Sequence, residues 1–259
     1  MISRRAVRLT LSVVGFVALW WVSTYVFFNP KLVPPPNEVA ATLWQLGING
    51  EMWEHVWASL RRVGIGYVLG SASGIAIGTI IGLYRIADEL LEPPLQFVRN
   101  ITPVAIVPLA IHAFGLDEAS KYFIVWYGTI IPVIFNTAMG VSSTPPIRIR
   151  AAMCLGATQR DIFFRIVIPS AWPFTLTGLR IALGFAFMGV VAAEMIAAES
   201  GVGFLIMQSR NMFLPAQMFA GLFMLGVIGM CTDRFFHFVL NRMMYAHMLM
   251  LTADIGADT

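Results

Sequence analysis

Long apolar stretches separated by short charged segments dominate this sequence. Four windows contain no Asp, Glu, Lys or Arg: residues 9–30, 63–84, 122–147 and 211–232. Because a helix needs about 20 apolar residues to cross the hydrocarbon core of a bilayer, each window is long enough to span a membrane. Two further apolar stretches, residues 97–116 and 174–197, contain few charged residues. The whole pattern therefore predicts an all-α membrane protein with six transmembrane helices. We expect them at residues 8–28, 62–84, 97–116, 121–141, 174–197 and 216–239.

The composition supports a membrane protein. The chain is 58% hydrophobic and 12% charged, whereas a soluble domain carries about 25% charged residues. A net charge of +3 does not indicate a nucleic-acid partner. Cys154 and Cys231 are too few for a disulfide framework, and we expect both to pack as small hydrophobic residues.

Basic residues predict the orientation, because they are more frequent in cytoplasmic loops. Placing the N-terminus in the cytoplasm gives ten arginines on that side and five basic residues on the other. The cytoplasmic set is Arg4, Arg5, Arg8, Arg85, Arg99, Arg148, Arg150, Arg160, Arg165 and Arg242. The outer set is Lys31, Arg61, Arg62, Lys121 and Arg210. With six spans the C-terminus is also cytoplasmic.

The segment between the first two spans has its own character. A proline run ends at Pro36 and is expected to be extended, and residues 37–61 are amphipathic with tryptophans typical of the membrane interface. The chain then divides into four parts. These are an N-terminal transmembrane helix (1–30), an outer proline run and amphipathic segment (31–61), a transmembrane core (62–243) with a loop at 145–173, and a cytoplasmic tail (244–259).

Glycine recurs at every fourth position of the second expected span. One helical face therefore carries Gly66, Gly70, Gly74, Gly78 and Gly82. In lipid, such a face allows a second helix to pack closely against the backbone. We interpret these glycines as helix-packing residues rather than as a nucleotide-binding loop.

One polar segment interrupts the apolar pattern. It runs from Arg150-Ala151-Ala152 through Gly156 and Arg160 to Ile166-Val167-Ile168-Pro169. Small residues, a glycine and a proline at these positions predict two short helices with a break at Gly156, the second ending at Pro169. We expect a cytoplasmic docking surface for a soluble protein; the alternative is an ordinary polar loop.

Polar residues inside predicted spans are candidates for a transport pathway, because they are costly in lipid. They are His112, Asn136, Arg180 and Glu194. The alternative for each is a structural role, such as a paired or hydrogen-bonded buried group. For Arg180, near the expected cytoplasmic end of its span, a gating or docking role is a further alternative.

Several kinds of chemistry are missing from the sequence. It contains no G-x-x-x-x-G-K-[ST] phosphate loop, so any ATP used must be hydrolysed by another polypeptide. The four histidines show no zinc-ligand spacing, and no nucleophile, base and orienting group form a set. We therefore expect no catalytic residues, no metal site and no cofactor in this chain.

The polar segment resembles the E-A-A-x-x-x-G-x(9)-I-x-L-P motif of membrane permease subunits in bacterial ABC importers. Ala151, Ala152, Gly156, Ile166 and Pro169 match the motif at the required spacing. Two positions depart from it, because Arg150 replaces the Glu and Ile168 replaces the Leu.

Other strings resemble the branch of this family that imports nitrate, sulfonates and taurine. They include Leu32-Val33-Pro34-Pro35-Pro36, Thr102-Pro103-Val104-Ala105 and Ala192-Ala193-Glu194-Met195. The resemblance implies the small ABC importer permease fold with cytoplasmic coupling helices, in a bacterial inner membrane. It also implies a second permease copy, two ATPase subunits that bind ATP and Mg, an outer solute-binding protein and surrounding lipid. A self-contained secondary transporter or channel is the alternative function, and a membrane scaffold is a third.

Overall fold

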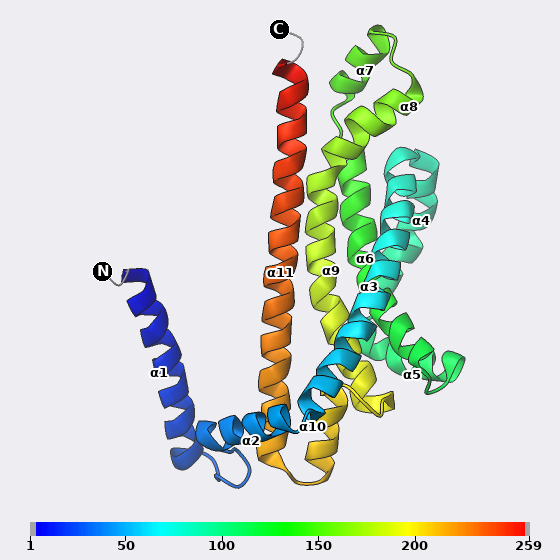
Figure 1. Cartoon of the computed structure of the whole chain (residues 1–259). Helices are drawn as coiled ribbons and strands as arrows, with labels where there is room; N and C mark the ends of the chain where they lie inside the picture. Colours follow the sequence, from blue (N-terminus) through cyan, green and yellow to red (C-terminus); the bar gives the residue numbers. More distant parts are fainter. Residues whose placement is uncertain (1–3, 257–259) are drawn as a thin grey trace.

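The computed structural model describes residues 4–256, which are almost entirely helical (Figure 1). The first half of the chain contains α1 (Arg4–Val26), α2 (Pro36–Ile48), α3 (Glu51–Leu83), α4 (Arg85–Arg99), α5 (Pro103–Phe114) and α6 (Glu118–Ser142). The second half contains α7 (Pro146–Cys154), α8 (Gln159–Ile162), the π-helical segment η1 (Phe163–Val167), α9 (Ile168–Ala197), α10 (Val202–Asn211) and α11 (Pro215–Gly256). Since the described residues include no strand, the prediction of an all-α fold is confirmed.

Helices α3, α6 and α9 form the core of the bundle, with α6 packed against both of the others. Three α6 side chains, Ile124, Val125 and Val133, are fully buried. Many large apolar side chains of the outer helices are exposed instead, as expected for surfaces that face lipid rather than water. α11 runs along α9 and contacts α10 and α2 near its start.

The close packing of α3 on α6 depends on glycine. A β-carbon added at Gly66 would lie 2.5 Å from Val125 Cβ, and one added at Gly82 would lie 2.6 Å from Val141 Cβ. Such distances are well inside van der Waals contact, so the two backbones approach as closely as they do because side chains are absent. The same is true of Gly70, Gly74 and Gly78, each within 3.0 Å of an α6 atom.

The second expected span begins earlier than the hydropathy indicated. We expected it at 62–84, but α3 is one helix from Glu51 to Leu83, so the expected boundary between residues 61 and 62 lies inside a helix. Gly50, with φ +81°, separates α3 from α2. Polar residues continue the helix because partners on other helices satisfy them, as described below for Arg62.

The third expected span, 97–116, is not a single helix. The chain forms two helices, α4 and α5, bent by 96° at the residues between them. Proline disfavours helical backbone in the residue before it, and Thr102 before Pro103 is accordingly extended, with ψ 149°. The expectation of one straight span was therefore wrong, because it ignored this Thr-Pro break. α4 also begins at Arg85, well before the expected start.

The number of membrane spans is confirmed only in part. Four helices of the described chain are long and apolar enough to cross a membrane, beginning at Glu51, Glu118, Gln159 and Pro215, and the bent α4–α5 pair makes a fifth possible. In α1 (Arg4–Val26), the apolar stretch that the structure describes in full is Val14–Val26, whereas the uncharged window in the sequence begins at residue 9. A span formed by α1 stays a prediction.

The segments at the two ends of the bundle also differ from expectation. The proline run is not wholly extended, because Leu32 and Val33 donate backbone hydrogen bonds to Asn29 O and form a turn. Pro36 already belongs to α2, where a proline in the first turn loses no helical hydrogen bond. The expected tail at 244–259 begins inside α11, which extends to Gly256, and residues 257–259 lie outside the described part.

Candidate functional site

The polar segment forms an elbow, residues 145–167, that projects from one end of the bundle (Figure 1). It comprises α7, a short turn, α8 and η1, and it lies at the end opposite to α2 and α10. α7 begins with Pro146 in its first turn. After α7 ends, Gly156 adopts φ +80°, a conformation that side chains with a β-carbon rarely adopt. The predicted break at Gly156 is therefore present.

The helix after this turn is fixed by reciprocal hydrogen bonds. Thr158 Oγ1 accepts from the Asp161 backbone N–H at 3.3 Å, and Asp161 Oδ2 accepts from the Thr158 backbone N–H at 3.1 Å. This capping box satisfies donors that a helix start leaves free. It gives the returning chain a defined starting point immediately after the glycine turn.

The second helix of the elbow does not end at Pro169, contrary to our expectation. Residues 159–197 form one continuous helix of 39 residues that passes through Pro169. A proline ring normally clashes with the carbonyl four residues earlier, and the π-helical turn Phe163–Val167 directly before it changes that local geometry. The fifth expected span, 174–197, accordingly starts too late.

The elbow has one face against the bundle and one face open. Ala152, like Ile149 and Ala157, packs against a buried cluster that includes Val141 and Ile162. The open face carries Arg150 and Ala151. Exposed apolar side chains lie beside them, because Ile147 is 70% exposed and Leu155 is 88% exposed. Of the remaining motif residues, Arg160 is exposed and Ile166, Ile168 and Pro169 are half-buried.

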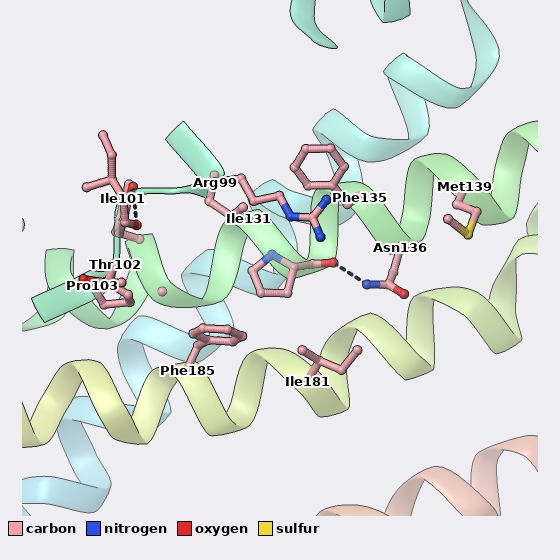
Figure 2. Close-up of a pocket in the computed structure, with 13 residues that line it drawn as sticks. Arg99, Ile101, Thr102, Pro103, Ile131, Phe135, Asn136, Met139, Ile181 and Phe185 are labelled. Atoms are coloured by element: carbon pink, nitrogen blue, oxygen red, sulfur yellow. Dashed lines mark hydrogen bonds between the residues drawn. The ribbon is translucent and has the colours of Figure 1, made fainter. Parts of the chain in front are cut away.

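We call the bend where α4 ends and α5 begins the hinge. A cavity of about 420 Å³ lies between this α4–α5 hinge and the central parts of α6 and α9 (Figure 2). Asn136 lines it and donates from Nδ2 to Pro132 O at 2.8 Å. Arg99, the last residue of α4, also lines it, with its guanidinium carbon 5.0 Å from the centre of the Phe135 ring. Asn136 is thus the one residue among the four pathway candidates that lines this cavity.

Glu194 lies in a buried ion-pair network, not in this cavity. Glu194 Oε1 is 2.9 Å from Arg62 Nη1, and Ser59 Oγ donates to the same carboxylate at 2.8 Å. The Gly203 backbone N–H donates to Glu194 Oε2 at 3.0 Å. Arg62 also binds Glu118 through Nη2 at 2.6 Å. The network therefore joins α3, α6, α9 and α10.

The other two pathway candidates lie elsewhere. Arg180 Nε on α9 is 3.6 Å from Asp233 Oδ1 on α11, and both side chains are about half exposed. His112 is exposed near the end of α5. The structure therefore does not bring the four candidates together, and a pathway role for each of them stays a prediction.

Two residues were not recognised as candidates from the sequence. Basic-residue counting places Arg62 on the outer side and Arg99 on the cytoplasmic side of the membrane; the structure adds that Arg62 is buried and that Arg99 lines the hinge cavity. A signal for Arg62 existed, because the carboxylate of Glu194 lies alone in an apolar stretch and favours a cationic partner. For Arg99 the signal was the nearby Thr102-Pro103 break.

Comparison with known proteins decides the family. The sequence model of the family described as "Binding-protein-dependent transport system inner membrane component" matches residues 74–245 of this chain. The chain belongs to this family. The matched region contains the C-terminal part of α3 and everything from α4 into α11, so both the elbow and the hinge cavity lie within the part that matches the family.

Curated relatives agree with this assignment. The chain is 41% identical to a probable ABC transporter permease protein of Brucella melitensis over 78% of this chain and 82% of that protein. It is 32% identical to the taurine transport system permease protein TauC of Escherichia coli (86% and 84% covered). It is 31% identical to the nitrate import permease protein NrtB of Synechococcus elongatus (85% and 83% covered).

The solved structure supports the fold alone. A chain of the MetNI methionine ABC transporter matches with a TM-score of 0.57 at 18% identity, over 74% of this chain and 94% of that chain.

As a member of the family, the protein is an inner-membrane transport permease rather than an enzyme, and membership implies ATPase and substrate-binding protein partners.

Proposed function

We propose that this permease forms the translocation pathway of an ATP-driven importer for a small oxyanion. The observation that carries the proposal is the elbow, a projecting pair of helices with an exposed surface of small and apolar side chains, in a chain of the permease family. The relatives named for taurine and nitrate support an anionic solute, because a sulfonate group and nitrate share negatively charged oxygens.

The elbow is the surface at which an ATPase would dock. Leu155 and Ile147 are largely exposed, and Ala151 beside them leaves room for a close approach. Burial of such apolar side chains against a soluble partner is favourable, at roughly 25 cal/mol per Å². ATP and Mg would bind to two such ATPase subunits, since this chain has no phosphate-binding loop.

The remaining partners complete the importer. A second copy of this permease would form the other half of the pathway, and a solute-binding protein would deliver the anion at the end that carries α2 and α10. Lipid would cover the exposed apolar side chains. With the elbow in the cytoplasm, both ends of the chain would lie on the cytoplasmic side of the membrane.

Transport would follow from movement of the elbow. ATP binding would bring the two ATPase subunits together and move the two elbows with them. Because α8, η1 and α9 form one helix, this movement would tilt α9 and switch access between the two sides, as a rigid-body transition.

The experiment is co-purification of the permease with its ATPase, followed by uptake in proteoliposomes. We compare wild type with Leu155→Glu, which places a charge on the open face of the elbow, and with Met212→Glu, an exposed apolar position near the opposite end. Leu155→Glu should lose the ATPase and ATP-dependent uptake, whereas Met212→Glu should still co-purify with the ATPase. The proposal fails if Leu155→Glu keeps the ATPase with normal coupling.

The same experiment tests the alternative of a secondary transporter or channel. That alternative requires solute movement by the permease alone. Uptake by proteoliposomes that contain the permease without any ATPase would support it and would contradict our proposal.

A further inference from the structure

The hinge between α4 and α5 is held near the middle of α6. Tyr127 Oη lies within hydrogen-bond distance of two hinge carbonyls, Val98 O at 2.9 Å and Ile101 O at 3.1 Å. Tyr127 is the tenth of the 25 residues of α6. The hinge therefore lies beside the middle part of α6 rather than at either of its ends.

The cavity contains a cation without a carboxylate partner. Arg62 and Arg180 each lie within 4.0 Å of a carboxylate, whereas no such ion pair involves Arg99 in the described part of the chain. No residue that lines the cavity is acidic. Because Arg99 is exposed and no carboxylate holds it, its guanidinium is available to a negative group from outside the chain.

The geometry directs the Arg99 side chain at the cavity. Figure 2 shows its guanidinium beside the Phe135 ring, on the same side as Asn136. Attraction between the cation and the ring helps to fix the orientation. The guanidinium has five N–H donors in a planar arrangement that fits the oxygens of an oxyanion.

Further donors surround the same space. Asn136 uses Nδ2 to donate to Pro132 O, which holds the amide in place at the cavity wall. Thr102 lines the cavity directly before α5, and its side chain does not cap that helix. The start of α5, a helix of 12 residues, adds a positive dipole end that favours an anion.

The rest of the wall is apolar and includes Ile131, Ile181 and Phe185. Such a wall accepts a short hydrocarbon group but offers no hydrogen bonds. The combination suits a small oxyanion with a short apolar substituent, whose charge lies at Arg99 and whose substituent lies against α9.

We propose that the hinge cavity is an anion-binding site within the translocation pathway and that Arg99 is the residue that binds the negative charge. This inference rests on the proposed function, and it names the substrate class and the binding residue of that pathway. A tilt of α9 would change the distance between Ile181 or Phe185 and Arg99, so the site would tighten or open during transport.

The test measures anion binding to the purified permease–ATPase complex. Methanesulfonate is the probe, and dimethyl sulfone is its neutral counterpart of similar shape. We compare wild type with Arg99→Gln, Arg99→Lys and a control, Arg85→Gln, which removes an exposed cation at the other end of α4. Binding is followed by the shift in unfolding temperature as each probe is titrated.

We expect methanesulfonate to stabilise wild type and Arg85→Gln, and dimethyl sulfone to stabilise neither. Arg99→Gln should weaken methanesulfonate binding by roughly tenfold to a hundredfold, the loss of a charge-assisted hydrogen-bond pair, and Arg99→Lys should fall between. If Arg99→Gln does not fold, Asn136→Asp tests the same site, because a carboxylate there should repel the probe. Unchanged binding in whichever of these two variants folds, or no stabilisation of wild type by methanesulfonate, overturns the inference.

ATPase coupling separates this inference from the proposed function. Arg99→Gln should still co-purify with the ATPase, because Arg99 at the end of α4 does not belong to the elbow, residues 145–167. If wild type couples ATP hydrolysis to uptake of taurine or nitrate and Arg99→Gln transports equally well, only the binding site is wrong. If wild type fails to couple at all, the proposed function is wrong.

Discussion

Arg62 on α3 and Glu194 on α9 form a buried ion pair, with Arg62 Nη1 2.9 Å from Glu194 Oε1 and only 2% and 0% of the two side chains exposed. The same guanidinium binds Glu118 on α6 through Nη2 at 2.6 Å. One side chain thus connects the three central helices at the end of the bundle that carries α10. Backbone groups of Gly203 and Ser200 complete the hydrogen bonding.

Replacing Arg62 should destabilise the protein strongly. Arg62→Gln leaves Glu194 buried without a cation, and breaking a buried ion pair by removing one partner costs about 3–5 kcal/mol. We expect a clear fall in the unfolding temperature of the detergent-purified protein. The control is Arg61→Gln, because the Arg61 side chain is 48% exposed and its nitrogen lies 3.4 Å from Glu118. Equal unfolding temperatures for the two variants would contradict this account.

The glycine face of α3 predicts a second difference between matched variants. Gly74→Leu places side-chain atoms where a β-carbon alone would lie 2.8 Å from Val133 Cβ, whereas Gly64 on the same helix has no neighbour within 4 Å. Overpacking typically costs about 1–3 kcal/mol. Gly74→Leu should therefore lower the unfolding temperature in detergent, and Gly64→Leu should not. The packing account fails if the two variants unfold together.

The turn in the elbow should be sensitive to proline. A β-carbon added at Gly156 would meet no atom within 4 Å, but the φ of this residue is +80°. The residue type at this position is therefore limited by backbone conformation and not by space. Proline fixes φ near −65° and cannot form this turn. Gly156→Pro should remain in the membrane but lose ATPase binding at least about tenfold, equivalent to 1.4 kcal/mol.

A control for the elbow exists at the other end of the bundle. Gly50 has a similar φ of +81° and equally open surroundings, so Gly50→Pro introduces comparable strain away from the elbow. It should leave co-purification with the ATPase unchanged. Ala152→Glu, which places a charge against the elbow's own buried cluster, should behave like Gly156→Pro. Normal ATP-coupled uptake by either elbow variant would show that the elbow is not the docking surface.

Tyr127 should control the mobility of the α4–α5 hinge. Tyr127→Phe removes a hydroxyl that reaches Val98 O and Ile101 O, and a hydrogen bond of this kind contributes about 0.5–1.5 kcal/mol. Hydrogen exchange of backbone amides at residues 98–105 should become faster. Tyr84→Phe, at an exposed position, is the control. Unchanged exchange in Tyr127→Phe would mean that other contacts hold the hinge.

Hydropathy and glycine spacing predicted the central fold well, because burial in lipid acts on composition along a whole helix. The α3 glycines lie against α6 at the expected positions. Helix ends were predicted less well. The π-helical turn before Pro169 and the continuation of α3 through Arg62 depend on tertiary contacts and local backbone geometry that no apolar window contains.

The candidate functional residues were likewise predictable only in part. The turn at Gly156 was predictable, because a positive φ selects a residue type. The cavity residue Arg99 was not, since its importance arises from a bend that brings the end of α4 beside Phe135. Counting basic residues assigns each one to a side of the membrane and cannot recognise a residue that lines a cavity.

The continuous helix from Gln159 to Ala197 has a mechanical consequence. Its 39 residues extend about 58 Å along the helix at 1.5 Å per residue, with the elbow at one end and Glu194 near the other. The ion pair with Arg62 anchors that far end to two neighbouring helices. Under the proposed function, force applied at the elbow would act along this helix about its anchored end, and the middle of the helix, where Ile181 and Phe185 line the cavity, would swing through the intermediate arc.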